Sequence, residues 1–246
     1  MRPFDAERGG MRLLRLDKFI CECRGVSRES ARQMIRAGRV LVDGAAQKRP
    51  ETKIDPAAQT VSLDGELLGW AQQRYYLLHK PLGVVTATED AQEKTVLELF
   101  PPELRRGLVP AGRLDKDTSG LLLLSTDGDW VHRVISPRHA VEKAYLAETD
   151  GALTEEDVSA LAAGVTLRDG TQCLPARLEL LGENRCRVTV TEGKYHLVRR
   201  LLASRGAPVL TLHRERIGSL RLDDSLPPGA FRALTEAEIE AVLINI

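Results

Sequence analysis

The chain has 246 residues, which fits two modest domains or one large one, and its 35 Lys plus Arg balance its 35 Asp plus Glu. This zero net charge argues against a uniformly basic nucleic-acid coat and against an acidic disordered tail. Four scattered cysteines are too few for a disulfide scaffold. No stretch approaches the roughly 20 apolar residues of a membrane span, and the N-terminus lacks an apolar signal core. The sequence therefore predicts a cytoplasmic protein with no membrane association.

Charge is distributed unevenly along the chain. Residues 11–60 contain 11 Lys or Arg and 6 Asp or Glu, a net charge of +5, whereas residues 61–246 contain 22 and 27, a net charge of −5. A small basic module therefore precedes a larger, mildly acidic one. Within the acidic part, residues 194–216 form a second basic cluster.

The basic part carries signals for two helices and several short strands. Apolar residues recur at helical spacing before Gly25, which ends the first helix. Ser27 is a suitable N-cap for a second helix, and Gly38 is a suitable residue to follow its end. Alternating apolar residues on either side of an Asp-Gly pair are typical of a β-hairpin. Helices are predicted over 13–24 and 28–37, a hairpin over 39–48, short strands over 54–68 and a domain boundary over 69–74.

The acidic part mixes strand and helix signals. Four consecutive leucines predict a buried strand, and Thr154 and Thr235 are suitable helix N-caps. Strands are predicted from 75 to a break at Pro81 and over 121–124, 141–149, 173–181, 185–191 and 208–218, helices over 154–163, 195–205 and 235–243, a Pro-containing loop over 100–110 and a turn at 127–128. Regular βαβ alternation is absent, so the predicted fold class is α+β with a mixed, mainly antiparallel sheet. The predicted domains are 11–70 and 74–246.

Three arginines of the second helix, Arg28, Arg32 and Arg36, are spaced four residues apart and therefore share one face. Like charges at this spacing repel each other, so the face is interpreted either as a phosphate-binding surface or as a solvated face partly neutralised by a nearby glutamate. Arg39 and Lys48, on the adjoining turn and hairpin, could extend it. Contacts of this kind with phosphates supply sequence-independent affinity for nucleic acid.

The segment RLDKFICECRGVSRESARQMIRAGRVLVDG (15–44) resembles the S4-type RNA-binding domain. The matching features are R-L-D at the first helix, G-x-S-R before the second, A-x-x-x-I-x-x-G-x-V, and the hairpin. The resemblance covers roughly residues 11–70 and implies binding to structured RNA, usually ribosomal, through the helix pair. It favours the phosphate-binding interpretation of the basic face.

The segment AGRLDKDTSGLLLL (111–124) is the chemically most informative stretch. In an extended chain Arg113 and Asp115 point the same way. An ionised, positioned Asp can be a nucleophile, a base or an ion-pair partner, and spacing alone favours the ion pair. Asp117 competes with Asp115 for any of these roles, and the residue types do not separate the two.

The same segment resembles the pseudouridine synthase signature G-R-L-D-x-x-T-x-G-L-L. This resemblance implies that Asp115 is the catalytic nucleophile and that Arg113 enters the RNA and helps to hold the target nucleotide flipped out of its stack. EKAYL (142–146) resembles the K-x-Y element, which implies that Lys143 binds substrate and that Tyr145 stacks on the uracil near the C5 proton. A lone Tyr in such a strand would otherwise be read as core packing.

A third element, GKYHLVRRLL (193–202), resembles G-x-x-H-Q-x-R/K-R. It implies that Arg199 is the basic residue that pairs with the nucleophilic Asp115. Leu197 stands where the family usually has Gln, so any hydrogen bond of that Gln is in doubt. The segment HKPLG (79–83) matches the element that opens the catalytic domain, and its Lys80 is interpreted as structural.

Together the motifs run from about residue 11 to 240 in the family's order, and the S4-like module with SPRHAVEKAYL, GKYH and LHRERIG is most similar to the small-subunit branch. The implied enzyme isomerises one uridine of 16S ribosomal RNA, uridine 516 by this resemblance, to pseudouridine. The implied reaction needs no cofactor and no metal, and it begins with attack of the Asp on uracil C6 or ribose C1′. The expected partner is small-subunit ribosomal RNA or an assembling 30S particle, and the expected state is a monomer.

Three alternatives remain open from the sequence. The chain could modify large-subunit (23S) RNA, or it could be a non-catalytic RNA-binding factor in ribosome assembly with a vestigial site. A carboxylate-dependent glycosidase lacks a clear partner acid and leaves the S4-like module unexplained. The presence of Asp115, Tyr145 and Arg199 together argues against the vestigial site.

Overall fold

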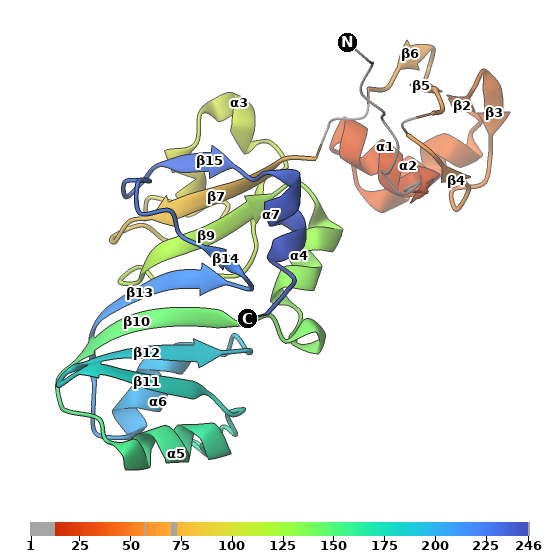
Figure 1. Cartoon of the computed structure of the whole chain (residues 1–246). Helices are drawn as coiled ribbons and strands as arrows, with labels where there is room; N and C mark the ends of the chain where they lie inside the picture. The colour runs from red at the N-terminus through yellow and green to blue at the C-terminus, as the bar shows by residue number, and fades with distance from the viewer. Residues whose placement is uncertain (1–12, 57, 70–72, 246) are drawn as a thin grey trace, which may run out of the picture. The chain divides into compact units, whose positions relative to one another are not determined.

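The structure is a computed structural model that describes residues 13–56, 58–69 and 73–245 (Figure 1). The chain divides into two compact units, Met1–Gln72 and Gln73–Ile246, here called the N-terminal and C-terminal units. Within the described residues no helix is both long and apolar enough to cross a membrane.

The N-terminal unit packs two helices against a small antiparallel sheet of order β3-β2-β5-β6. Phe19, Ile20 and Ile35 of the helices are buried together with Val40 and Val61 of the strands, as their spacing in the sequence predicts. The elements are β1 (Leu14–Arg15), α1 (Leu16–Arg24), α2 (Arg28–Arg36), β2 (Val40–Val42), β3 (Ala45–Gln47), β4 (Lys53–Ile54), β5 (Val61–Leu63) and β6 (Glu66–Leu67).

The predicted ends of the helices in this unit are confirmed, except for the start of the first helix. The hydroxyl of Ser27 accepts a hydrogen bond of 3.1 Å from the backbone N–H of Ser30 and so caps α2. Gly38 follows the helix with a left-handed φ of +73°. The first helix, however, begins at Leu16 rather than at residue 13, because Leu14–Arg15 pairs with Lys53–Ile54 as a two-stranded sheet.

The C-terminal unit is built on one mixed sheet of order β11-β12-β10-β13-β9-β7-β15, with β14 paired to β13 and β8 to β9 (Figure 1). Only β13 and β9 pair in parallel among the described strands, so the predicted α+β fold with a mainly antiparallel sheet is confirmed. The strands are β7 (Tyr75–Lys80), β8 (Val109–Pro110), β9 (Ser119–Ser125), β10 (Lys143–Thr149), β11 (Arg177–Gly182), β12 (Arg185–Val190), β13 (Val209–Ile217), β14 (Leu220–Arg221) and β15 (Phe231–Ala233). The helices are η1 (Val96–Leu99), α3 (Pro102–Arg105), α4 (Gly128–Ile135), η2 (Pro137–His139), α5 (Glu155–Ala163), α6 (Leu197–Ser204) and α7 (Glu236–Ala241).

Both faces of the central strand β9 are covered, which explains its run of four leucines. Leu122 and Leu124 join the core cluster that includes α5 and α6, whereas Leu121 and Leu123 join a separate cluster with α4 on the other face. Side chains of a strand alternate between faces, and a strand covered on both sides needs apolar residues at every position.

Two loops predicted in this unit contain helices. The turn expected at Asp127-Gly128 is instead the start of α4, because the Asp127 carboxylate accepts hydrogen bonds from the backbone N–H groups of Asp129 (3.0 Å) and Trp130 (3.2 Å). Trp130 is fully buried and donates its indole N–H to the carbonyl of Ile239 at 3.0 Å, which fastens α4 to α7. The loop predicted over 100–110 contains the short helix α3, which begins at Pro102.

Candidate active site

The C-terminal unit contains a cavity of about 670 Å³ between the loop that precedes β9, strands β10 and β13, and the loop that leads into α6. The five residues predicted for catalysis and substrate binding come from three separate segments of the chain. All five line this one cavity: Arg113, Asp115, Lys143, Tyr145 and Arg199.

The loop that carries Asp115 is fastened by the strand and loop that open the unit. The ammonium of Lys80 donates hydrogen bonds to the carbonyls of Asp115 (3.0 Å) and Thr118 (2.9 Å), and the Thr86 hydroxyl donates to that of Leu114 (2.7 Å). Lys80 is fully buried, and this burial lowers its pKa to about 8. Its contacts are those of a structural residue that fixes the backbone on both sides of the candidate nucleophile.

The structure separates the two competing aspartates. Asp115 lines the cavity with a side chain that is 32% exposed, and its carboxylate lies 3.4 Å from the His196 imidazole. Asp117 is 67% exposed and does not line the cavity. Only Asp115 can therefore meet a molecule that enters the cavity.

The predicted pairing of Arg199 with Asp115 is wrong in this structure. The Arg199 guanidinium instead forms an ion pair of 2.9 Å with the Asp117 carboxylate and donates a hydrogen bond of 3.0 Å to the Asp117 carbonyl. The two aspartates stand two residues apart in an irregular loop, where side-chain direction does not follow strand alternation. Arg199 still lines the cavity from the first turn of α6.

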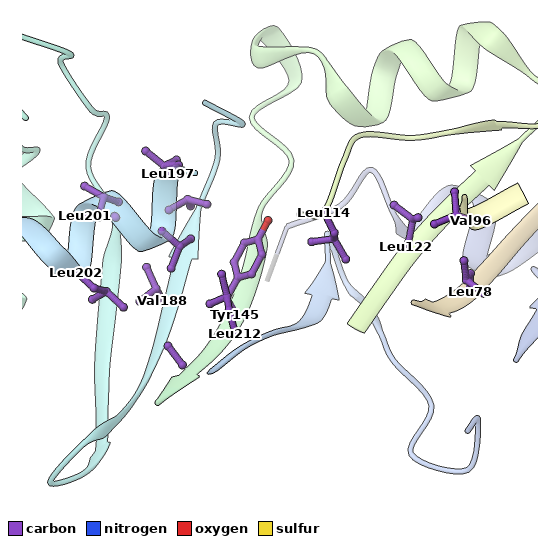
Figure 2. Packing of buried hydrophobic residues seen from close by; sticks show 14 of the residues in the cluster. Leu78, Val96, Leu114, Leu122, Tyr145, Val188, Leu197, Leu201, Leu202 and Leu212 are labelled. Carbon is purple, nitrogen blue, oxygen red and sulfur yellow. The ribbon is translucent and has the colours of Figure 1, made fainter. Parts of the chain in front are cut away.

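Tyr145 is almost fully buried and lines the cavity. Its hydroxyl accepts a 3.3 Å hydrogen bond from the guanidinium of Arg214, which lies on the neighbouring strand β13. Figure 2 shows the Tyr145 ring between Leu197 of α6 and Leu114, with the hydroxyl oxygen at the end of the ring away from Leu212. Part of the Tyr145 side chain thus packs in the apolar core, and part of it lines the cavity.

Two buried cations stand beside Tyr145. Lys143 donates a hydrogen bond of 2.7 Å to the carbonyl of Val141, and burial, together with the charge of Arg214, lowers its pKa to about 8. Arg214 is 2% exposed and donates to the carbonyl of Leu121 at 2.8 Å. Two basic side chains thus lie close together in this wall, so the wall favours an anionic group.

Two site residues, Arg214 and His196, had no role predicted from the sequence. Arg214 belongs to the basic cluster over 194–216, and His196 belongs to the third motif. Membership in either segment does not indicate whether a side chain lines the cavity or lies on the surface. Among the described residues, no group of three or more His, Cys, Asp or Glu converges as metal ligands.

The predicted basic face of the N-terminal unit contains two kinds of arginine. Arg32 lies 3.3 Å from the fully buried Asp17 carboxylate, and Arg39 pairs with Asp64 at 2.9 Å. Arg28 and Arg36 are exposed and form no ion pair with any described residue. Lys48 is also exposed, and its Cε lies 3.5 Å from the position that a Cβ on Gly38 would occupy, which puts it beside the end of α2.

Comparison with known proteins agrees with both units. Residues 74–204 match the family of RNA pseudouridylate synthases, and residues 14–59 match the S4 domain. The chain is 43% identical over 231 residues to the ribosomal small subunit pseudouridine synthase A of Yersinia pestis, which covers 93% of this chain and 98% of that protein. It is also 43% identical over 234 residues to the protein of the same name from Escherichia coli strain K12, with 94% and 100% covered.

A solved structure described as a pseudouridylate synthase covers 93% of this chain and 99% of its own, with a TM-score of 0.68 and 40% identity. Fold, motif order and near-complete coverage thus agree. The chain therefore belongs to the RNA pseudouridylate synthase family, and within it to the ribosomal small-subunit pseudouridine synthases that carry an N-terminal S4 domain.

Proposed function

We propose that this enzyme isomerises one uridine of 16S ribosomal RNA, uridine 516 by family resemblance, to pseudouridine in the cytoplasm, with Asp115 as the nucleophile. In this proposal residues 11–70 dock the RNA and residues 74–246 carry out the chemistry. The observation that carries the proposal is the position of Asp115 in the same cavity as Tyr145, Lys143 and Arg113. The substrate is naked RNA or an assembling 30S particle, and the enzyme acts as a monomer.

The proposed reaction proceeds without redox chemistry. Asp115 forms a bond to uracil C6 or ribose C1′, the glycosidic C1′–N1 bond breaks, the base rotates and C5 bonds to C1′. The bond to Asp115 then breaks, the C5 proton leaves and N1 takes up a proton, so that the product is an isomer of the substrate and the enzyme is regenerated. The detached base has to stay close to the ribose throughout, and a closed cavity supplies this proximity. Tyr145 would stack on the uracil, and Arg214, bonded to its hydroxyl, would hold the ring in place.

The glycosidase alternative is disfavoured by the second carboxylate of the cavity. Glu192 also lines it, but its carboxylate accepts a hydrogen bond of 3.0 Å from the backbone N–H of Leu174 and pairs with Lys194. Both oxygens of Glu192 are therefore already bound, Oε1 by Leu174 and Oε2 by Lys194, and Glu192 is not a free partner acid for glycoside hydrolysis. The family to which the chain belongs also disfavours a large-subunit target and a non-catalytic assembly role, and the experiment below distinguishes all three.

The test is carbodiimide mapping of ribosomal RNA from cells that lack this chain. The expected result is the loss of one pseudouridine from 16S RNA, restored by the wild-type chain but not by the Asp115→Asn variant. Loss from 23S RNA would replace the proposed substrate by the large-subunit alternative. An unchanged pattern in both RNAs would favour the non-catalytic assembly factor.

Arg36→Ala is expected to weaken RNA binding and to flatten the dependence of log Kd on log salt by about one unit, because one phosphate contact is lost. Arg36 is exposed and unpaired among the described residues, so thermal stability should be unchanged. Gln33→Ala, an exposed neutral position of the same helix, is the control and should alter neither quantity. Binding titrations at four salt concentrations measure the slope, and equal slopes for Arg36→Ala and Gln33→Ala would remove Arg36 from the RNA-binding face.

A further inference from the structure

Tyr195 and His196 form a two-ring stack at the edge of the cavity. Their ring centroids lie 3.8 Å apart and their planes differ by 18°, which is a face-to-face stack. Both residues line the cavity, and Tyr195 is nonetheless 75% exposed. Since one face of the tyrosine ring is covered by the imidazole, most of the exposed surface belongs to the other face and to the edges.

The stack is connected to the candidate nucleophile. The His196 imidazole contacts both groups: one of its faces stacks on the Tyr195 ring, and its Nε2 is 3.4 Å from the Asp115 carboxylate. Tyr195 is thus connected to the candidate nucleophile through His196. Because Tyr195 and Asp115 line the same cavity, a base on the open face of Tyr195 lies at the cavity in which Asp115 would meet its target.

The backbone of Tyr195 and His196 is held by hydrogen bonds from Arg200. Arg200 donates a hydrogen bond of 3.3 Å to the Tyr195 carbonyl, and its backbone N–H donates to the His196 carbonyl at 2.9 Å. The Arg200 guanidinium is itself paired with Asp169. His196 has a left-handed φ of +49°, which is uncommon for a residue other than glycine. The backbone of this loop is therefore constrained, and the stack on His196 gives the Tyr195 ring one covered and one open face.

We propose that the open face of Tyr195 binds the base of the nucleotide adjacent to the target uridine. This inference rests on the proposed function. When a uridine leaves its stack, the neighbouring base loses a stacking partner, and an aromatic side chain replaces it with little dependence on base identity. The Tyr195–His196 stack supplies such a face beside Asp115 and so binds the RNA in its flipped-out form.

The experiment uses the full chain and synthetic RNA oligonucleotides that contain the uridine identified by mapping. Three oligonucleotides are compared: the natural sequence, one with an abasic ribose on the 5′ side of the target uridine, and one with an abasic ribose on its 3′ side. Tyr195→Leu removes the ring, and Tyr195→Phe keeps it as the matched control. Kd is measured in the Asp115→Asn background, where turnover does not interfere, and KM and kcat are measured with the intact nucleophile.

On natural RNA, Tyr195→Leu is expected to raise Kd and KM about tenfold, with kcat within about twofold, whereas Tyr195→Phe should change none of them. At one of the two neighbouring positions, the abasic substitution should raise the Kd and KM of the wild-type enzyme by the same factor. The Kd and KM of Tyr195→Leu should not rise further with that RNA. An effect of Tyr195→Leu that persists undiminished on both abasic RNAs, or that falls on kcat alone, would show that the ring only supports His196 and would overturn the inference. If the wild-type enzyme modifies no RNA but still binds it, the proposed function fails instead.

Discussion

Asp115→Asn is expected to lower pseudouridine formation by at least about 10³-fold, because removing a nucleophile abolishes the covalent step. The amide is nearly isosteric with the carboxylate, and the hydrogen bonds that Lys80 and Thr118 donate go to the Asp115 backbone carbonyl, which the substitution keeps. RNA affinity should therefore stay within about tenfold of the wild-type value, since most of it comes from phosphate contacts. Turnover is measured as release of tritium from C5-tritiated uridine in RNA, and affinity by filter binding.

The structure supplies a matched control two residues away. Asp117→Asn should retain turnover within about tenfold, because this carboxylate is exposed, lies outside the cavity and serves only to pair with Arg199. Retained turnover in Asp115→Asn would place the nucleophile elsewhere, and loss of equal size in both variants would contradict a special role of Asp115. The comparison also tests whether the Arg199–Asp117 pair contributes to the site.

Gly120→Ala is expected to destabilise the protein by about 3 kcal/mol or more, because an added methyl group has no room. Gly120 lies where β9 pairs in parallel with β13, and a Cβ there would lie 2.3 Å from the carbonyl oxygen and 2.6 Å from the nitrogen of Arg214. Its φ of +112° adds strain for any residue with a side chain. Because Arg214 bonds Tyr145, turnover should fall as well.

Gly128→Ala is the control for this substitution. Gly128 is the first residue of α4, and no atom lies within 4 Å of a Cβ built there, so stability should change by less than about 1 kcal/mol. Urea unfolding of the full chain measures both variants. Equal stability of Gly120→Ala and the wild type would mean that β9 and β13 can separate without cost, contrary to the register described here.

The ion pairs of the second basic cluster could not be predicted from charge counts along the sequence. The basic cluster over 194–216 has one acidic residue within it, yet most of its members form ion pairs in the structure. Arg199, Arg200 and Arg205 pair with Asp117, Asp169 and Asp157, which lie 31 to 82 residues away. Arg214 is the member that remains buried in the cavity without a carboxylate partner among the described residues. A charge count over a short segment includes only residues close in sequence, whereas the ion-pair partners in the folded protein come from distant segments.

The sequence by itself determined the two-part organisation, the mixed α+β fold and the set of segments that form the cavity. Periodicity, caps and turns act over a few residues, and the motifs name residue types that the chemistry requires. Only the tertiary structure decided that Asp115 rather than Asp117 lines the cavity, that Arg199 pairs with Asp117, and that His196 and Arg214 join the site. The direction of a side chain in an irregular loop and the identity of an ion-pair partner depend on which strands and loops pack together, and residue spacing does not carry that information.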